Sequence, residues 1–148
     1  MFRGSSYHTI DDKGRVVIPS RFRGVVRAQD VDGLIVSGMD DCLLAYTFSE
    51  WSKVEDRIIQ IPEKDETLRR FRRMFIGNAQ ECHCDKHDRI LIPPTLREYA
   101  ELSRDIVLAG VIDHFEIWNR ERWDREHNAY KDDLKNPTAR GSIDRVAI

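Results

Sequence analysis

Two short segments of the chain place an aspartate four residues before an arginine, a spacing suited to a charged turn. They are Asp11-Asp12-Lys13-Gly14-Arg15 and Asp85-Lys86-His87-Asp88-Arg89. An arginine that follows a tight turn projects its guanidinium from a rigid edge, where it can bind a phosphate or read guanine bidentately. The same arginine can instead pair with the aspartate and clamp the turn. We expect DNA contact from Arg15 first and also from Arg89, whereas Asp11 and Asp85 stabilise the turns because carboxylates repel phosphate.

Other residues near these segments could support the same chemistry. Lys13 is exposed by its position in the turn and is a natural phosphate partner. Arg3 lies near the start of the chain, where it could reach a backbone phosphate. Gly14 accepts the positive φ that such a turn requires. In the second segment Asp88 stands where the first has Gly14, and His87 stands where the first has Lys13, so this turn is less basic and less flexible.

The two segments belong to a longer internal repeat. Residues 11–23 align with residues 85–97 at an offset of 74, and both copies read Asp, three residues, Arg, an apolar triplet, Pro, two residues, an apolar residue and Arg. The similarity continues downstream at an offset of 72, where residues 34–38 match residues 106–110 and Trp51 matches Trp123. The first copy is longer by two residues near Ala28–Gly33, which predicts a surface loop. We conclude that the chain contains a duplication.

Each copy predicts a strand, a turn, a strand, a short helical segment, a hairpin and a helix. Thr47 and Asn119 are equivalent N-cap residues for the final helices. The remaining predictions are an apolar stripe in each final helix (Trp51, Val54, Ile58 and Ile61; Trp123, His127, Tyr130 and Leu134), a helix over Glu63–Phe75, and a loosely ordered tail from Asn136. Because each copy is too small to bury enough surface alone, the copies should complete each other as a pseudo-twofold unit. The predicted boundaries are 5–53 for repeat 1, 54–78 for connecting helices, 79–124 for repeat 2, and 125–148 for the C-terminal helix and tail.

These motifs resemble the SpoVT-AbrB type of swapped-hairpin DNA-binding module. Two such modules in one chain, with the opening Met1-Phe2-Arg3-Gly4 and the later Phe115-Glu116-Ile117-Trp118, resemble the MraZ family of bacterial regulators. The resemblance implies a mainly β fold with peripheral α-helices, an AbrB-like swapped-hairpin barrel built from two repeats. It further implies a cytoplasmic, nucleoid-associated repressor of its own operon of cell-division and cell-wall genes. Such a protein assembles into a homo-oligomeric ring and binds short repeated boxes in double-stranded DNA.

The composition is compatible with this interpretation, although the net charge conceals it. The chain has 148 residues, of which 41% are hydrophobic and 34% charged, and its net charge is −2. No apolar run approaches the length of a membrane span, and three cysteines do not indicate a disulfide framework. Residues 1–27 carry a local charge of +4, whereas residues 28–48 carry −4. A cationic face can therefore exist on an acidic chain.

Competing functions find less support in the residues. Cys82 and Cys84 alternate along a predicted strand and fit core positions better than a zinc site, so we expect no metal and no cofactor. No catalytic motif is present, so we expect no enzyme and no small-molecule substrate. Arg69–Arg73 is interpreted as a solvated or subunit-facing helix. A protein-binding module stays open as an alternative, because swapped-hairpin folds also serve as antitoxins.

Overall fold

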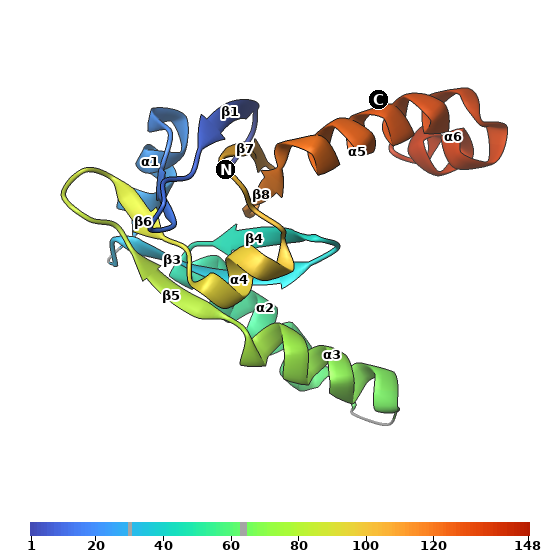
Figure 1. The fold of residues 1–148 in the computed structure, drawn as a ribbon. Coiled ribbons are helices and arrows are strands. Elements are labelled where there is room, and N and C mark those ends of the chain that lie inside the picture. Colours follow the sequence, from blue (N-terminus) through green and yellow to red (C-terminus); the bar gives the residue numbers. More distant parts are fainter. Residues whose placement is uncertain (30, 63–64) are drawn as a thin grey trace.

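The strands of the described chain form two antiparallel sheets (Figure 1). The structure, a computed structural model, describes residues 1–29, 31–62 and 65–148. The larger sheet contains, in spatial order, β1 (Ser5–Thr9), β7 (Asp105–Gly110), β8 (Phe115–Asn119), β4 (Cys42–Tyr46), β3 (Gly33–Met39) and β5 (Gln80–His83). The smaller sheet is a two-stranded ribbon of β2 (Arg15–Val17) and β6 (Arg89–Leu91). The helices are α1 (Ser20–Arg27), α2 (Phe48–Gln60), α3 (Glu66–Gly77), α4 (Pro94–Tyr99), α5 (Arg120–Lys135) and α6 (Pro137–Asp144).

The two repeats exchange strands with each other. Strand β1 of repeat 1 pairs with β7 of repeat 2, and β5 of repeat 2 pairs with β3 of repeat 1. Strands β4 and β8 pair at the centre of the sheet, and β2 pairs with β6 in the ribbon. Swapping the repeats leaves this strand order unchanged, which is the pseudo-twofold relation that the sequence predicts. The mainly β fold with peripheral helices is confirmed.

The main core lies between the ribbon and the larger sheet. Val16 and Ile90 face each other on the inner side of the ribbon and are both completely buried. They belong to the same cluster as the rings of Phe2, Phe22 and Phe115, whose centroids lie 4.9–5.3 Å apart. Every second side chain of a strand points to the same face, so the inner side chains of strands from both repeats meet between the two sheets. Residues from both repeats therefore share one core.

A second core covers the other face of the sheet. Thr47 caps α2 by accepting a hydrogen bond from the backbone N–H of Glu50, and the helix ends at Gln60, before Pro62. Trp51 of α2 then packs against Phe75 of α3, with ring centroids 5.4 Å apart. The buried Ser37 hydroxyl of β3 donates a 2.6 Å hydrogen bond to the Phe75 carbonyl, which ties α3 to the sheet.

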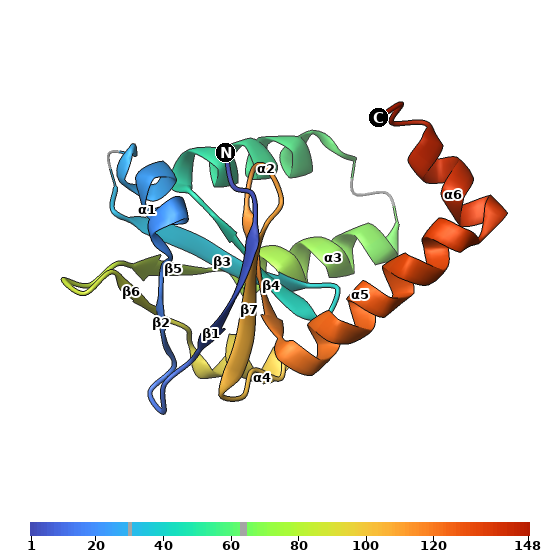
Figure 2. The same cartoon turned by 90° about the horizontal axis from the view of Figure 1, so that it is seen from above.

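The C-terminal helices reach away from both sheets (Figures 1 and 2). The side-chain oxygen of Asn119 caps α5, as predicted, but neither α5 nor α6 contains a buried residue. Trp123 contacts Trp118 at 6.1 Å between ring centroids, whereas Tyr130 is half exposed. Of the predicted stripe of α5, Trp123 packs against the second core, whereas His127 and Tyr130 stay exposed even though α6 packs beside α5.

Two further predictions concern the C-terminal tail and the helix that connects the two repeats. The predicted loosely ordered tail is wrong for residues 137–144, which form α6 because Asn136 caps it and Pro137 fits the first helical position. Of the predicted helix Glu63–Phe75, the first two residues lie outside the described residues, as does Asp30 of the predicted loop. Helix α3 begins at Glu66, where the Asp65 carboxylate accepts a bond from the Leu68 N–H. Among the described helices, none is long and apolar enough to cross a membrane.

Candidate nucleic-acid interface

The first charged turn connects β1 to β2 and is organised around Asp11. One carboxylate oxygen, Oδ1, accepts hydrogen bonds from the backbone N–H groups of Lys13 (3.0 Å) and Arg15 (2.8 Å). The other oxygen, Oδ2, accepts from Arg15 Nε at 2.6 Å. The hydrogen bond from the Arg15 backbone and those from the Arg15 side chain and the Lys13 backbone lower the pKa of Asp11. The carboxylate therefore stays ionised and fixes both the turn and the arginine.

The second turn, between β5 and β6, repeats this geometry. Asp85 Oδ1 accepts from the backbone N–H groups of His87 (2.8 Å) and Arg89 (2.9 Å), and Oδ2 accepts from Arg89 Nε at 2.8 Å. The backbone hydrogen bond from Arg89, followed by that from His87, holds the pKa of Asp85 at about 2. The duplicated spacing in the sequence thus corresponds to a duplicated hydrogen-bond network.

Both arginines are oriented by one nitrogen and keep the rest of the guanidinium available. The aspartates bind only Nε, and the terminal nitrogens of Arg15 and Arg89 have no hydrogen-bond partner in the part of the chain that the structure describes. The side chains are 33% and 27% exposed, respectively. The clamp and the contact that the sequence offered as alternatives are therefore compatible, because pairing through Nε leaves the outer edge free to bind two acceptors.

The ribbon places the two arginines on one outer face. Arg15 is opposite Leu91, and Val17 is opposite Arg89, so all four side chains alternate with the buried Val16 and Ile90. Val17 is 48% exposed and Leu91 is 55% exposed. This arrangement forms a small, twofold-related surface of two cations and two apolar side chains, which we call the ribbon face (Arg15, Val17, Arg89 and Leu91).

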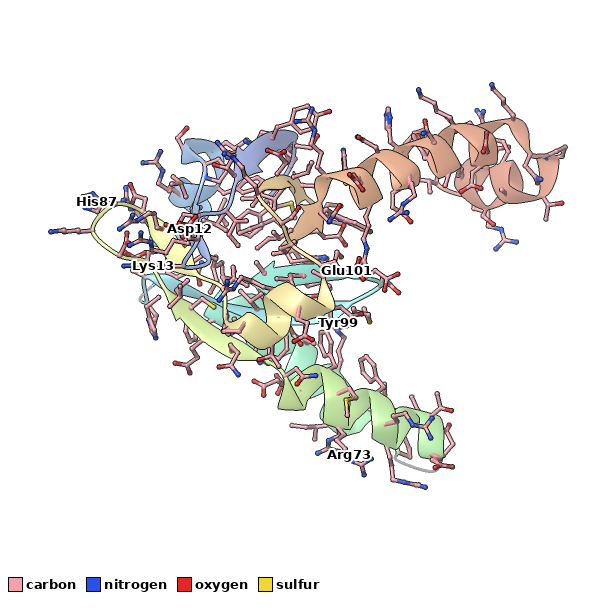
Figure 3. All side chains as sticks on the ribbon, in the orientation of Figure 1. Asp12, Lys13, Arg73, His87, Tyr99 and Glu101 are labelled. Atoms are coloured by element: carbon pink, nitrogen blue, oxygen red, sulfur yellow. The ribbon has the colours of Figure 1, made fainter. Side chains whose placement is uncertain are left out.

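A charged turn stands at each end of the ribbon face. The Gly14 carbonyl accepts from the Ile92 N–H (2.8 Å), and the Asp88 carbonyl accepts from the Ile18 N–H (2.9 Å). Gly14 and Asp88 therefore lie about 13 Å apart, the length of four strand residues. Lys13 and His87, both exposed, occupy the two turns; they lie on the same side of the molecule in Figure 3, and the two turns point in different directions in Figure 2.

The structure separates Arg3 from the rest of the predicted interface. Phe2 forms a bridge with Ile112, so the backbone of Arg3 lies beside the end of β7, against Gly110. The five residues of β1, roughly 16 Å of strand, stand between Arg3 and the first turn. Arg3 therefore does not belong to the surface formed by Arg15, Lys13 and Arg89 within one chain.

Comparison with known proteins identifies the family of this chain. The family model described as "MraZ protein, putative antitoxin-like" matches residues 1–74 and again residues 75–144. The chain belongs to the MraZ family. Proteins named transcriptional regulator MraZ are similar over their whole length, with 54% identity in Desulforapulum autotrophicum and 47% in Desulfosudis oleivorans, each covering 100% of both chains. A further one, from Syntrophobacter fumaroxidans, is 46% identical over 88% of this chain and 87% of its own.

One position makes the two halves of this MraZ chain chemically different. Gly14 has φ +92°, and a Cβ there would lie 2.7 Å from Arg97 Nε and 2.8 Å from the Ile92 carbonyl. Its counterpart Asp88 has φ +61°, which aspartate tolerates better than most residues. The Asp88 carboxylate binds two arginines of α1, Arg23 at 2.8 Å and Arg27.

The sequence did not predict the contact between Asp88 and the two arginines, although two features of the sequence pointed to it. Arg23 and Arg27 are four residues apart, so they lie on the same face of the short helix that the sequence predicts. Asp88 interrupts a repeat that has glycine at the equivalent position. The two features lie in different repeats, and only the strand exchange brings them together.

The cysteines and the basic helix α3 are not part of this interface. Burial raises the pKa of the Cys82 thiol to about 11 and, with help from Asp32 and Asp88, that of Cys84 to about 12. The residues that the structure describes contain no group of three or more His, Cys, Asp or Glu side chains that could hold a metal ion. Arg73 lies on α3, away from Lys13 and His87 (Figure 3), and Arg70 pairs with Glu66 at 3.2 Å, as the same-helix spacing predicts.

Proposed function

We propose that the chain is a sequence-specific DNA-binding transcriptional regulator that inserts the ribbon face into the major groove. The observation that carries this proposal is the pair of partly exposed arginines, Arg15 and Arg89, held through Nε, whose terminal nitrogens have no hydrogen-bond partner among the described residues. The major groove is about 12 Å wide and admits a two-stranded ribbon, and a guanidinium edge matches O6 and N7 of guanine. The exposed Val17 and Leu91 suit the thymine methyl groups of the same groove.

The surrounding residues take roles that follow from their positions. Lys13, at the tip of the first turn, contacts a phosphate beside the groove, and such contacts set register and affinity rather than sequence. Asp11 and Asp85 do not touch DNA but keep the arginines extended. Arg3 lies at the other end of β1, so we infer that it meets a phosphate only where a second copy of the chain holds DNA against that end.

The regulatory role proposed here extends what the family membership supports. Relatives named transcriptional regulator MraZ, together with the ribbon face, support DNA as the partner. We propose that the chain acts in the cytoplasm on the nucleoid, as a repressor of its own operon of cell-division and cell-wall genes. A ring of several copies would touch successive short boxes about one helical turn apart, and this multivalency would offset weak binding by one ribbon.

A DNA-binding titration with matched variants tests this proposal. The probe is a labelled duplex from the upstream region of the chain's own gene, with a scrambled duplex of equal length, read by fluorescence anisotropy at fixed salt. Arg15→Ala should weaken binding to the upstream duplex about 5- to 150-fold, the value of a bidentate guanine contact. Arg73→Ala, on the distant helix α3, should bind like the parent. If Arg15→Ala binds as tightly as the parent, or the parent shows no preference for the upstream duplex, the proposal is wrong.

A protein-binding, antitoxin-like role is the alternative, and the description of the matching family favours keeping it. The projecting α5 and α6, which bury no residue within the chain, offer a surface for a partner. Capture of a partner from lysate that survives nuclease treatment, combined with the absence of sequence preference on DNA, would support this role over DNA binding.

A further inference from the structure

Asp88 joins the two repeats through a carboxylate shared by two arginines. Its Oδ2 accepts from Arg23 Nη1 at 2.8 Å, and its Oδ1 accepts from Arg27 Nη2. Both arginines lie on α1 of repeat 1, whereas Asp88 lies in the second turn, of repeat 2. The two guanidinium groups therefore converge on one point beside the end of the ribbon face.

The equivalent point of the other repeat has no carboxylate. Gly14 stands where Asp88 would be, and Arg97, the counterpart of Arg23, lies across this glycine. Arg97 donates only from Nε to the Ile92 carbonyl (3.0 Å), and no acidic side chain of the described residues pairs with it. Of the two arginines, only Arg23 has an arginine counterpart, because the residues 72 and 74 positions after Arg27 are Tyr99 and Glu101. The first turn therefore lacks both the carboxylate and the second arginine of this site.

We propose that Arg23 and Arg27 form an anion-binding site for a DNA backbone phosphate and that Asp88 occupies this site in the free chain. This inference rests on the proposed function, since it adds a phosphate contact to the same DNA-binding surface. Two guanidinium groups that converge on a planar carboxylate offer the donor arrangement that phosphate oxygens also accept. Asp88 therefore acts as an internal competitor that reduces the affinity of the second turn for DNA.

The three side chains are exposed enough for a phosphate to reach the site from solvent. Arg27 is 56% exposed, Arg23 is 33% exposed and Asp88 is 22% exposed, so the pair is accessible from solvent at the edge of the turn. Ion pairs at this level of exposure are weak and are screened by salt.

The placement of the site favours the phosphate backbone over the bases. Helix α1 lies next to the β5–β6 turn that carries Asp88, at the edge of the ribbon rather than on its outer face (Figure 2). A duplex whose groove receives Arg15 and Arg89 presents its backbone along the margins of the ribbon. The site should therefore change affinity and salt dependence while leaving sequence preference unaltered.

The experiment measures the salt dependence of DNA binding for the full chain and charge variants. Asp88→Asn removes the charge but keeps the shape and the tolerance of positive φ, and Asp88→Gly reproduces the first repeat. Each new phosphate contact steepens the plot of log affinity against log salt by about 0.9. With one new phosphate contact, the variant should lose roughly 3- to 4-fold more affinity than the parent between 50 and 200 mM salt.

Two controls isolate the proposed site. Asp12→Asn removes an exposed acid of the first turn, which has no arginine partner in the described chain, and should leave the slope unchanged. Asp88→Asn combined with Arg27→Gln should reduce the slope change, because it removes one of the two guanidinium groups that hold the phosphate. Thermal unfolding of Asp88→Asn at the same salt concentrations checks that the fold is retained; its backbone hydrogen bond to Ile18 does not depend on the side chain.

The outcomes separate this inference from the proposed function. If Arg15→Ala loses binding while Asp88→Asn and Asp88→Gly keep the parental slope or bind more weakly, Asp88 only clamps the turn and the inference is wrong. If the Asp88 variants steepen the slope while Arg15→Ala binds like the parent, the phosphate site stands and the proposed base-reading role fails. If no protein binds either duplex, both are overturned.

Discussion

Gly14 is the position at which a single methyl group should disturb the proposed interface most. Its φ of +92° lies beyond the left-handed region that other residues use, which costs an alanine about 1–2 kcal/mol. The new Cβ would also lie 2.7 Å from Arg97 Nε and 2.8 Å from the Ile92 carbonyl. That carbonyl is backbone and accepts the hydrogen bond from Arg97 Nε, so it cannot shift without disturbing this bond, and the contact adds about 1–2 kcal/mol. We expect Gly14→Ala to lower the free energy of unfolding by about 3 kcal/mol.

Gly24 provides the matched control for this prediction. It lies inside α1, and a Cβ there would meet nothing within 4 Å. Gly24→Ala should therefore stabilise the chain by about 0.5–1 kcal/mol, the helix preference of alanine over glycine. In thermal unfolding followed by circular dichroism at fixed protein concentration, Gly14→Ala should lower Tm by roughly 6–12 °C, and Gly24→Ala should raise it. The reasoning is refuted if Gly14→Ala melts within about 2 °C of the parent or if both variants fall equally.

Two further predictions test the second core and the hairpin between β7 and β8. Ser37→Ala should lower the free energy of unfolding by about 1–3 kcal/mol in urea titrations, because it leaves the buried Phe75 carbonyl without its donor; an unchanged midpoint would contradict this. Burial lowers the pKa of His114, but the nearby carboxylates of Glu116 (3.8 Å) and Asp113 (2.7 Å) outweigh it and raise the pKa above 6.5. The stabilisation is complete below pH 6.5 and is lost as pH rises through the folded-state pKa, so His114→Gln should cost more Tm at pH 6 than at pH 8.5. An equal cost at both pH values would show that protonation of His114 contributes nothing.

The sequence predicted the features that depend on local chemistry or on the comparison of the two repeats. The Asp–Arg spacing corresponds to real hydrogen-bond networks, and Thr47 and Asn119 cap the helices that they precede. The strand exchange follows from the duplication, because two incomplete copies had to share a core. In each case the pattern repeats at an equivalent position, which distinguishes it from a chance match.

The features that the sequence did not predict depend on contacts between the repeats or on weak local signals. The stripe in α5 matches that of α2 in spacing, but α2 meets the buried Phe75 of α3, whereas α6, which packs against α5, contains no buried residue. Helix α6 has no apolar periodicity, and its N-cap at Asn136 was its main signal. The contact between Asp88 and α1 joins residues more than 60 positions apart, beyond the reach of any local rule.

The exchange of strands also affects how the chain is made. Ser5 of β1 pairs with Ala109, so the first strand to leave the ribosome waits for a partner that is synthesised roughly 100 residues later. At translation rates of about 5–20 residues per second, this wait lasts roughly 5–20 s. During that time the edge of β1 and the inner face of β2 are open to pairing with the same segments of a neighbouring nascent chain. When several ribosomes translate one message, their nascent chains lie close together during this interval. These chains can then exchange hairpins between two molecules instead of within one molecule.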